Sequence, residues 1–176
     1  MIEMKQHNRV CAEIDLDAIA HNMEQMRDRI GGGARLIAVI KTDGYGHGAV
    51  PIAEMFEGFS YVWGYAVACL EEATELRIHG IEKPILVLGC VFPDQYEEML
   101  RYDIRPTVYT EKMAEKISEE AVRLGKTAHF HIKIDTGMGR LGFPVQGESI
   151  DVIERISHFA GVELEGMFTH FAKADE

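Results

Sequence analysis

Residues 129–135 read His-Phe-His-Ile-Lys-Ile-Asp, a strict alternation of polar and apolar side chains. Such alternation places the two kinds of side chain on opposite faces of a β-strand. In a parallel sheet covered by helices, the polar face does not meet solvent, and it lines a barrel interior near a site. This stretch therefore favours a barrel, although the spacing of the elements also fits a doubly wound open sheet.

Short apolar runs alternate with longer amphipathic ones over the rest of the chain, which is typical of parallel strands joined by crossover helices. We predict strands at Arg35–Ile40, Tyr61–Ala66, Ile85–Leu88, Ile104–Val108, Ala128–Ile134 and Val162–Phe168, with an earlier one at Val10–Leu16. A closed (β/α)8 barrel needs about 250 residues, and this chain has 176. We therefore expect an incomplete TIM-type barrel with about six of the eight strands.

Two helices have clear sequence signals. Ile19, Met23, Met26 and Ile30 recur at helical spacing before the glycines at 31–33. A second helix follows Thr110, a favourable N-cap residue. It ends at Gly125, because helices commonly end at a glycine in the left-handed conformation.

Composition narrows the possible partners. The chain has 18 basic and 29 acidic residues, a net charge of −11, which disfavours nucleic acid and anionic membranes and leaves small molecules. The sequence contains no signal-peptide pattern and no apolar run long enough to span a bilayer, so we expect a cytoplasmic protein. Cys11, Cys69 and Cys90 lack the spacing of a zinc site or a disulfide framework.

Lys41 directly follows the apolar run Leu36–Ile40, so it lies at the carboxyl end of a predicted strand. The catalytic residues of α/β enzymes lie at this end of the strands. An amine there can condense with an aldehyde. The next residues, Gly44-Tyr45-Gly46-His47-Gly48, let the backbone approach a ligand closely, and the Tyr45 hydroxyl can donate to a phosphate oxygen. We interpret His47 as structural.

Two further strand ends carry polar residues. Gly137-Met138-Gly139-Arg140-Leu141-Gly142 matches the dinucleotide-binding pattern, but Pro144 and the turn after it delay the next helix to about Glu148. Arg140 is better explained as a fixed cation for an anionic oxygen.

His170 ends the last strand. His129 and His131 suggest a metal, but no cluster completes a coordination set, and we expect no metal.

Four stretches, in order, resemble the N-terminal barrel of alanine racemases, which are fold-type III enzymes dependent on pyridoxal 5′-phosphate. They are Ala12–Ile19, Ala38–Lys41 with Tyr45–Gly48, Asp135–Gly142 and Phe168–Ala172. The resemblance covers essentially all of residues 1–176. It implies a partial pyridoxal-phosphate-binding barrel domain, with a C-terminal β-domain absent.

The resemblance implies a role for each site residue. Lys41 would bind the cofactor covalently and act as the base for the α-proton of the D-amino acid. Tyr45 would reach the cofactor phosphate, His170 would pack beside the pyridine ring, and Arg140 would bond the phenolic oxygen and lie next to the substrate. Lys133 matches a lysine that is carbamylated in many family members. In place of the family's usual Ala-Asn-Ala, this chain has Thr42-Asp43-Gly44, which adds a negative charge near Lys41.

The implied activity is interconversion of L-alanine and D-alanine, an isomerase reaction that supplies D-alanine to cell-wall peptidoglycan. The full-length enzyme is expected to be a homodimer in which the partner subunit contributes a tyrosine as the second base. We expect the 176 residues to be inactive alone. The alternatives are a serine or broad-specificity racemase and a non-catalytic pyridoxal-phosphate-binding barrel. The dinucleotide hypothesis is a third.

Overall fold

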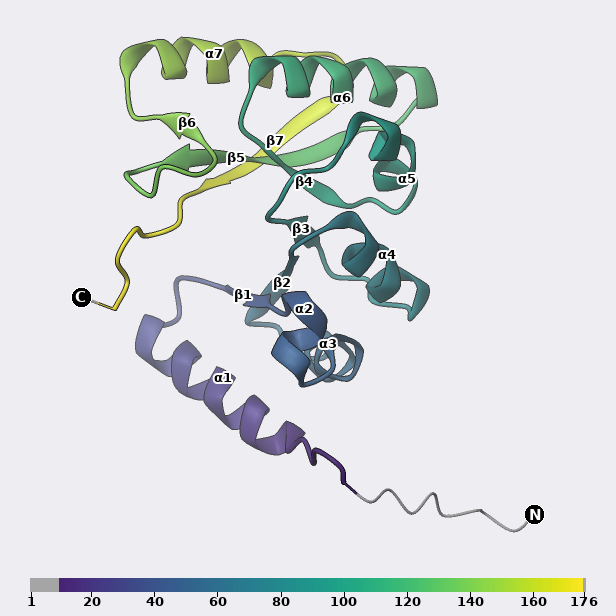
Figure 1. Cartoon of the computed structure of the whole chain (residues 1–176), viewed down its shortest axis with the longest axis vertical. Coiled ribbons are helices and arrows are strands. Elements are labelled where there is room, and N and C mark those ends of the chain that lie inside the picture. The colour runs from purple at the N-terminus through teal and green to yellow at the C-terminus, as the bar shows by residue number, and fades with distance from the viewer. Residues whose placement is uncertain (1–9, 176) are drawn as a thin grey trace.

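A computed structural model describes residues 10–175 of the chain (Figure 1). Helices and strands alternate along it. In chain order the elements are α1 (Leu16–Ile30), β1 (Leu36–Val39), α2 (Lys41–Gly46), α3 (Ala49–Glu57), β2 (Val62–Val67), α4 (Leu70–Ile78), β3 (Ile85–Val87), a 3-10 turn (Pro93–Gln95), α5 (Tyr96–Arg101), β4 (Arg105–Val108), α6 (Glu111–Leu124), β5 (Ala128–Asp135), β6 (Phe143–Pro144), α7 (Gly147–Ser157) and β7 (Val162–Phe168).

The strands form one parallel sheet in the order β1-β2-β3-β4-β5, with β7 paired to β5. The short β6 pairs with the last two residues of β5. Helices α4, α5, α6 and α7 follow one side of the row of strands (Figure 1). The six strands predicted from Arg35 onward are confirmed to within one residue at each end, and among residues 10–175 only the two-residue β6 was not predicted.

The sheet is curved as in a barrel, not open. Strands β2 and β5 are three positions apart in the sheet, which in a flat sheet separates them by about 14 Å. Yet the rings of Trp63 on β2 and His131 on β5 have centroids only 5.6 Å apart. The strands therefore bend around a common interior, as the expected incomplete TIM barrel requires, and the doubly wound alternative is wrong.

The apolar core lies between the strands and the helices. Phe130 and Ile132 of β5 have no exposed surface and pack in this core, together with Phe56 of α3 and Ile117 of α6. The polar residues of β5 point to the opposite face, toward the barrel interior, so the alternation predicted for residues 129–135 is confirmed. No helix in residues 10–175 is long and apolar enough to cross a bilayer.

Helix ends follow the predicted capping, with one correction. The Thr110 hydroxyl accepts the Met113 N–H, and Gly125 is left-handed at the end of α6. The strand predicted at Val10–Leu16 is wrong, because residues 10–15 pair with no strand in the described part of the chain. A strand needs a neighbour for its backbone polar groups, whereas the Asp15 carboxylate accepts the Ala18 N–H at 2.9 Å and starts α1.

Candidate active site

The carboxyl ends of the parallel strands form one edge of the sheet, and the candidate residues lie along it. Lys41 comes two residues after β1, Arg140 is in the loop after β5, and His170 is two residues after β7. Strands β1 and β7 are at opposite ends of the strand order, so the candidate site spans the whole edge. Within residues 10–175, no hydrogen bond or ion pair joins these three side chains.

The backbone after Lys41 forms a left-handed turn. Thr42, Asp43, Gly44 and Tyr45 have φ between 52° and 60° and ψ between 34° and 50°. Left-handed helical geometry costs about 1–2 kcal/mol for each L-residue, and only Gly44 escapes that cost. Gly44 is also packed closely, because an added Cβ would lie 3.0 Å from Ile52 Cδ1 and 3.3 Å from the Ala49 nitrogen. Backbone strain of this kind gathers at functional sites.

Hydrogen bonds hold the far end of this turn. The Gly48 N–H donates to the Asp43 carbonyl at 2.9 Å, and His47 Nδ1 lies 2.9 Å from the Gly44 carbonyl oxygen. The structural interpretation of His47 is therefore confirmed. The Asp43 carboxylate accepts the Ala49 N–H at 2.8 Å, at the start of α3. The Asp43 carboxylate, which replaces the asparagine usual in the resembling sequences, thus accepts a hydrogen bond at the N-terminus of α3. Among the described residues it forms no ion pair with Lys41.

The turn brings Tyr45 next to Lys41. The Lys41 ammonium nitrogen lies 5.9 Å from the centroid of the Tyr45 ring. Tyr45 is 59% exposed, and its hydroxyl makes no hydrogen bond within residues 10–175. A half-buried amine and an unengaged phenol therefore lie side by side at the end of β1.

Lys133 lies on the interior face of β5, where only 6% of its surface is exposed. Its ammonium nitrogen is 4.8 Å from the centroid of the Phe168 ring on β7. Burial, and then repulsion from Arg140, lowers the pKa of Lys133, and Asp135 opposes this only in part. The positive charge of Arg140 therefore disfavours a second cation at Lys133.

The loop between β5 and β6 is organised by Asp135. Its carboxylate accepts the N–H groups of Gly137 at 2.9 Å and Gly139 at 3.1 Å, and these bonds hold its pKa below the usual value. Gly142 has a φ of 136°, and an added Cβ would lie 2.5 Å from the Asp135 nitrogen. The glycines therefore shape a loop folded back on β5. Because α7 begins only at Gly147, they open no helix, which argues against the dinucleotide hypothesis.

The ends of β5 and β7 are joined on this edge. The hydroxyl oxygens of Thr136 and Thr169 are 2.8 Å apart, which ties the loop that carries Arg140 to the residue before His170. Arg140 and His170 are both exposed. The Arg140 guanidinium makes no ion pair or hydrogen bond within the described residues.

One polar cluster in the interior was missed by the sequence reasoning. Arg105 of β4 is 8% exposed and contacts both Asp103 and Glu165. His131 Nε2 lies 3.1 Å from Glu165 Oε2. The signal that could have found it is the second alternating strand, in which Glu163 and Glu165 alternate with apolar residues and Glu163 pairs with His129 of the β5 polar face.

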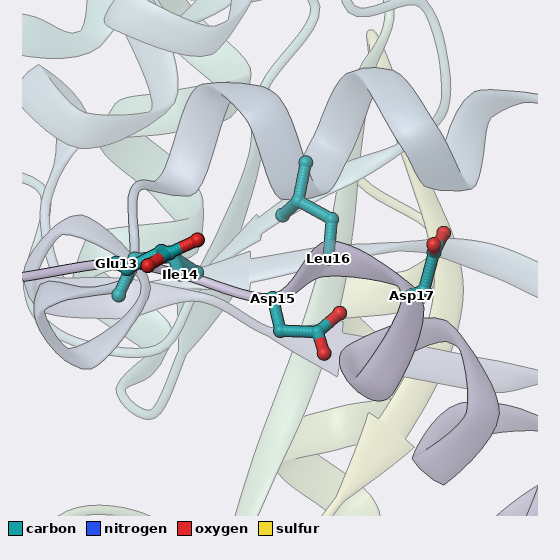
Figure 2. Close-up of a pocket in the computed structure, with 5 residues that line it drawn as sticks. All are labelled: Glu13, Ile14, Asp15, Leu16 and Asp17. Atoms are coloured by element: carbon teal, nitrogen blue, oxygen red, sulfur yellow. The ribbon is translucent and has the colours of Figure 1, made fainter.

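A hollow lies away from these residues, at the start of α1. It has a volume of about 590 Å³ and is lined by Glu13, Ile14, Asp15, Leu16 and Asp17. Figure 2 shows the Asp15 and Asp17 carboxylates pointing to different sides, and Asp15 is occupied as a helix cap. An acidic, divergent lining suits neither a metal nor a phosphate. Across residues 10–175, no group of three His, Cys, Asp or Glu side chains is arranged to hold a metal ion.

The strand-end edge offers a donor set that fits pyridoxal phosphate. The cofactor carries an aldehyde, a phenolic oxygen and a phosphate, so it needs an amine and several cationic or hydroxyl donors. Lys41 supplies the amine, while the Tyr45 hydroxyl and the Arg140 guanidinium are accessible and not consumed by internal partners. These residues fit the group.

Comparison with known proteins agrees with this geometry. The family described as alanine racemase, N-terminal domain, matches residues 14–176. The alanine racemase of Clostridium tetani is 47% identical over 169 residues, which cover 95% of this chain and 43% of that protein.

Solved structures give the same result. The alanine racemase structure from Clostridium difficile 630 superimposes with a TM-score of 0.85 at 41% identity, over 92% of this chain and 41% of that one. A histidine racemase from Leuconostoc mesenteroides has a TM-score of 0.85 at 26% identity, over 97% of this chain and 45% of that one. The chain thus spans less than half the length of the relatives it matches.

Proposed function

This chain belongs to the family of alanine racemase N-terminal domains, and from that premise we propose that it supplies the cofactor-binding barrel for pyridoxal-phosphate-dependent interconversion of L-alanine and D-alanine. The observation that carries the proposal is Lys41, a half-buried amine on a strained turn at the carboxyl end of β1, with the Tyr45 ring 5.9 Å from its nitrogen. We take residues 1–176 as one partial barrel domain.

In this proposal each residue has a distinct task. Lys41 binds the cofactor aldehyde and takes or returns the α-proton of the amino acid on one face. The Tyr45 hydroxyl donates to the phosphate, the Arg140 guanidinium holds the phenolic oxygen and contacts the substrate, and His170 packs beside the ring. When bound, pyridoxal phosphate supplies a conjugated ring that delocalises the electrons left by the departing proton.

We propose that Lys133 is carbamylated and orients Arg140. Two observations support this. Its pKa is lowered by burial and by Arg140, so the neutral amine that reacts with carbon dioxide is more populated than at an exposed lysine. A carbamate would also replace a repelling cation beside Arg140 with an anion that attracts it.

The same proposal extends to the oligomeric state and the cellular role of the whole protein. We propose a homodimer whose partner subunit supplies the second base, and a cytoplasmic role in providing D-alanine for peptidoglycan. The cytoplasmic assignment is supported by the thiols of Cys11, Cys69 and Cys90, all free in the structure, since thiols stay reduced in that compartment.

Borohydride reduction tests the assignment of Lys41. After incubation with pyridoxal phosphate, reduction should attach the cofactor permanently to Lys41, as found by peptide mass spectrometry. Lys41→Ala should lose the label, and the exposed-lysine control Lys126→Ala should keep it. Label on another lysine would overturn the assignment.

Exchange of the substrate α-proton for deuterium separates the remaining possibilities. A chain extended to the length of its relatives should exchange and racemise alanine. Cofactor binding without exchange would indicate a non-catalytic barrel. Preferential exchange of serine or histidine would move the substrate away from alanine.

A further inference from the structure

The left-handed turn after Lys41 is held at its near end by a residue from another helix. Glu72, in the first turn of α4, accepts the Thr42 N–H on Oε1 at 2.8 Å. Its other oxygen, Oε2, accepts the Ala68 N–H at 2.7 Å. Thr42 follows Lys41, and Ala68 follows β2, so one carboxylate ties together the ends of two neighbouring strands.

We propose that Glu72 is a positioning residue, which holds the Thr42–Tyr45 turn so that Lys41 and Tyr45 keep their places at the strand-end edge. Its effect on the reactivity of Lys41 rests on the proposed function, but its hold on the turn does not.

The need for such a hold follows from the backbone. Thr42 is β-branched with a φ of 54°, a conformation that such residues rarely adopt. Its N–H has Glu72 as its acceptor, and bonds to an ionised carboxylate are stronger than bonds between neutral groups. Without Glu72, the turn retains the bond from the Gly44 N–H to the Ile40 carbonyl and the bonds of Asp43 and Gly48, but none of these satisfies the Thr42 N–H.

The chemistry of the contact requires a carboxylate. Both partners are N–H donors, and both oxygens of Glu72 accept. A glutamine of the same size has one accepting oxygen and one NH2 group, and the NH2 group would face an N–H. Glu72→Gln therefore breaks one of the two bonds with almost no change in volume.

A matched control lies on the same helix. Glu75 of α4 is exposed, and its side chain has no hydrogen bond or ion pair in the described residues. Glu75→Gln makes the same chemical change in the same helix without touching the turn.

The first readout is residue-resolved amide hydrogen exchange of the protein without added cofactor. In the wild type, Thr42 and Ala68 should be protected. Glu72→Gln should raise exchange at one or both of them, and across residues 42–45, by about tenfold, the value of a bond to a charged group. Residues 49–57 of α3 and the Glu75→Gln variant should be unchanged.

The second readout is covalent capture of pyridoxal phosphate, in which the Lys41 nitrogen bonds to the aldehyde carbon and water leaves. Capture is followed by visible absorbance and by the borohydride-trapped fraction at Lys41, at a temperature where all variants are folded by Trp63 fluorescence. Glu72→Gln should slow capture by about tenfold. Glu75→Gln should capture at the wild-type rate.

The outcomes are distinguishable. Fast exchange of Thr42 in the wild type would overturn the proposal even if Glu72→Gln fails to fold. Altered exchange with unaltered capture would show that Glu72 holds the turn but does not position Lys41, which also overturns it. If the wild type itself captures no cofactor at Lys41, the proposed function fails, while the exchange result still decides the role of Glu72 in the turn.

Discussion

Arg105 and Glu165, 60 residues apart in the sequence, meet inside the barrel with Arg105 Nε 3.3 Å from Glu165 Oε2. The guanidinium also contacts Asp103, and Glu165 also contacts His131. A packed TIM barrel is usually filled by branched apolar residues. Here the interior face at the end remote from Lys41 carries a buried guanidinium paired with two carboxylates.

This network predicts a loss of stability in acid. Burial alone raises the pKa of Glu165, but hydrogen bonds from Arg105 and His131 bring it below its usual value, and Arg105 does the same for Asp103. A lowered folded-state pKa stabilises the fold above the unfolded-state value, about 4.3 for Glu, and this stability disappears as the pH falls through the folded-state value.

Glu165→Gln should therefore lower the free energy of unfolding by about 2 kcal/mol at pH 7 and flatten its dependence on pH between 3 and 5. Urea unfolding followed by fluorescence of Trp63, the only tryptophan, measures both, because its ring lies against His131. Glu163→Gln, which removes an exposed partner of His129 on the same strand, should change stability by less than about 0.5 kcal/mol. Equal effects of the two variants would contradict the conclusion that the contacts of Glu165 with Arg105 and His131 stabilise the fold.

Lys133 should form a carbamate. In buffer containing 13C-labelled bicarbonate, the protein should show a carbamate carbon signal that is lost in Lys133→Arg. The exposed-lysine variant Lys126→Arg should keep it. A signal that persists in Lys133→Arg would mean that another lysine is modified.

Arg140→Lys should separate cofactor binding from turnover. The substitution keeps the charge but loses the forked donors, so in a chain extended to the length of its relatives we expect turnover to fall by on the order of 100-fold while the cofactor stays bound at Lys41. Arg29→Lys, at an exposed position on α1, is the control. Unchanged turnover in Arg140→Lys would refute the role of Arg140.

Gly142→Ala should destabilise the loop that carries Arg140. At a φ of 136°, with backbone atoms 2.5 Å from the new Cβ, we expect a cost of about 1–3 kcal/mol in thermal unfolding. Gly147→Ala introduces the same methyl group at the start of α7, with nothing within 4 Å, and should be nearly neutral. A neutral Gly142→Ala would mean that the loop relaxes freely.

The 176 residues expressed on their own should self-associate and should not racemise alanine. The strands at the two ends of the sheet order expose apolar side chains, with Val39 of β1 43% exposed and Met167 of β7 63% exposed, and such edges recruit other strands. Analytical ultracentrifugation should show association that Ile37→Lys on β1 reduces. Ile78→Lys, at an exposed position on α4, should not reduce it. If residues 1–176 alone racemise alanine as fast as an extended chain, the second base must lie within these residues, and the prediction is wrong.

The sequence by itself determined six of the strands, the two helices that start at Leu16 and Glu111, and the sheet edge on which Lys41, Arg140 and His170 were predicted. The alternation of residues 129–135, the Thr110 cap and Gly125 are local signals, because the period of side chains and the need for a left-handed residue act within a few positions. Lys41, Arg140 and His170 could be assigned to one edge because parallel strands all end on the same side.

Tertiary structure alone decided which side chains from distant parts of the sequence come into contact. The segment at Val10–Leu16 has a plausible strand sequence, but no neighbouring strand accepts its backbone, so it is not one. Glu72 reaches Thr42 across 30 residues, and Arg105 reaches Glu165 across 60. The Arg105–Glu165 contact depends on strand curvature and lies beside a register shift between β5 and β7. A shift of one residue moves a side chain to the other face of the sheet, and no local pattern in the sequence specifies it.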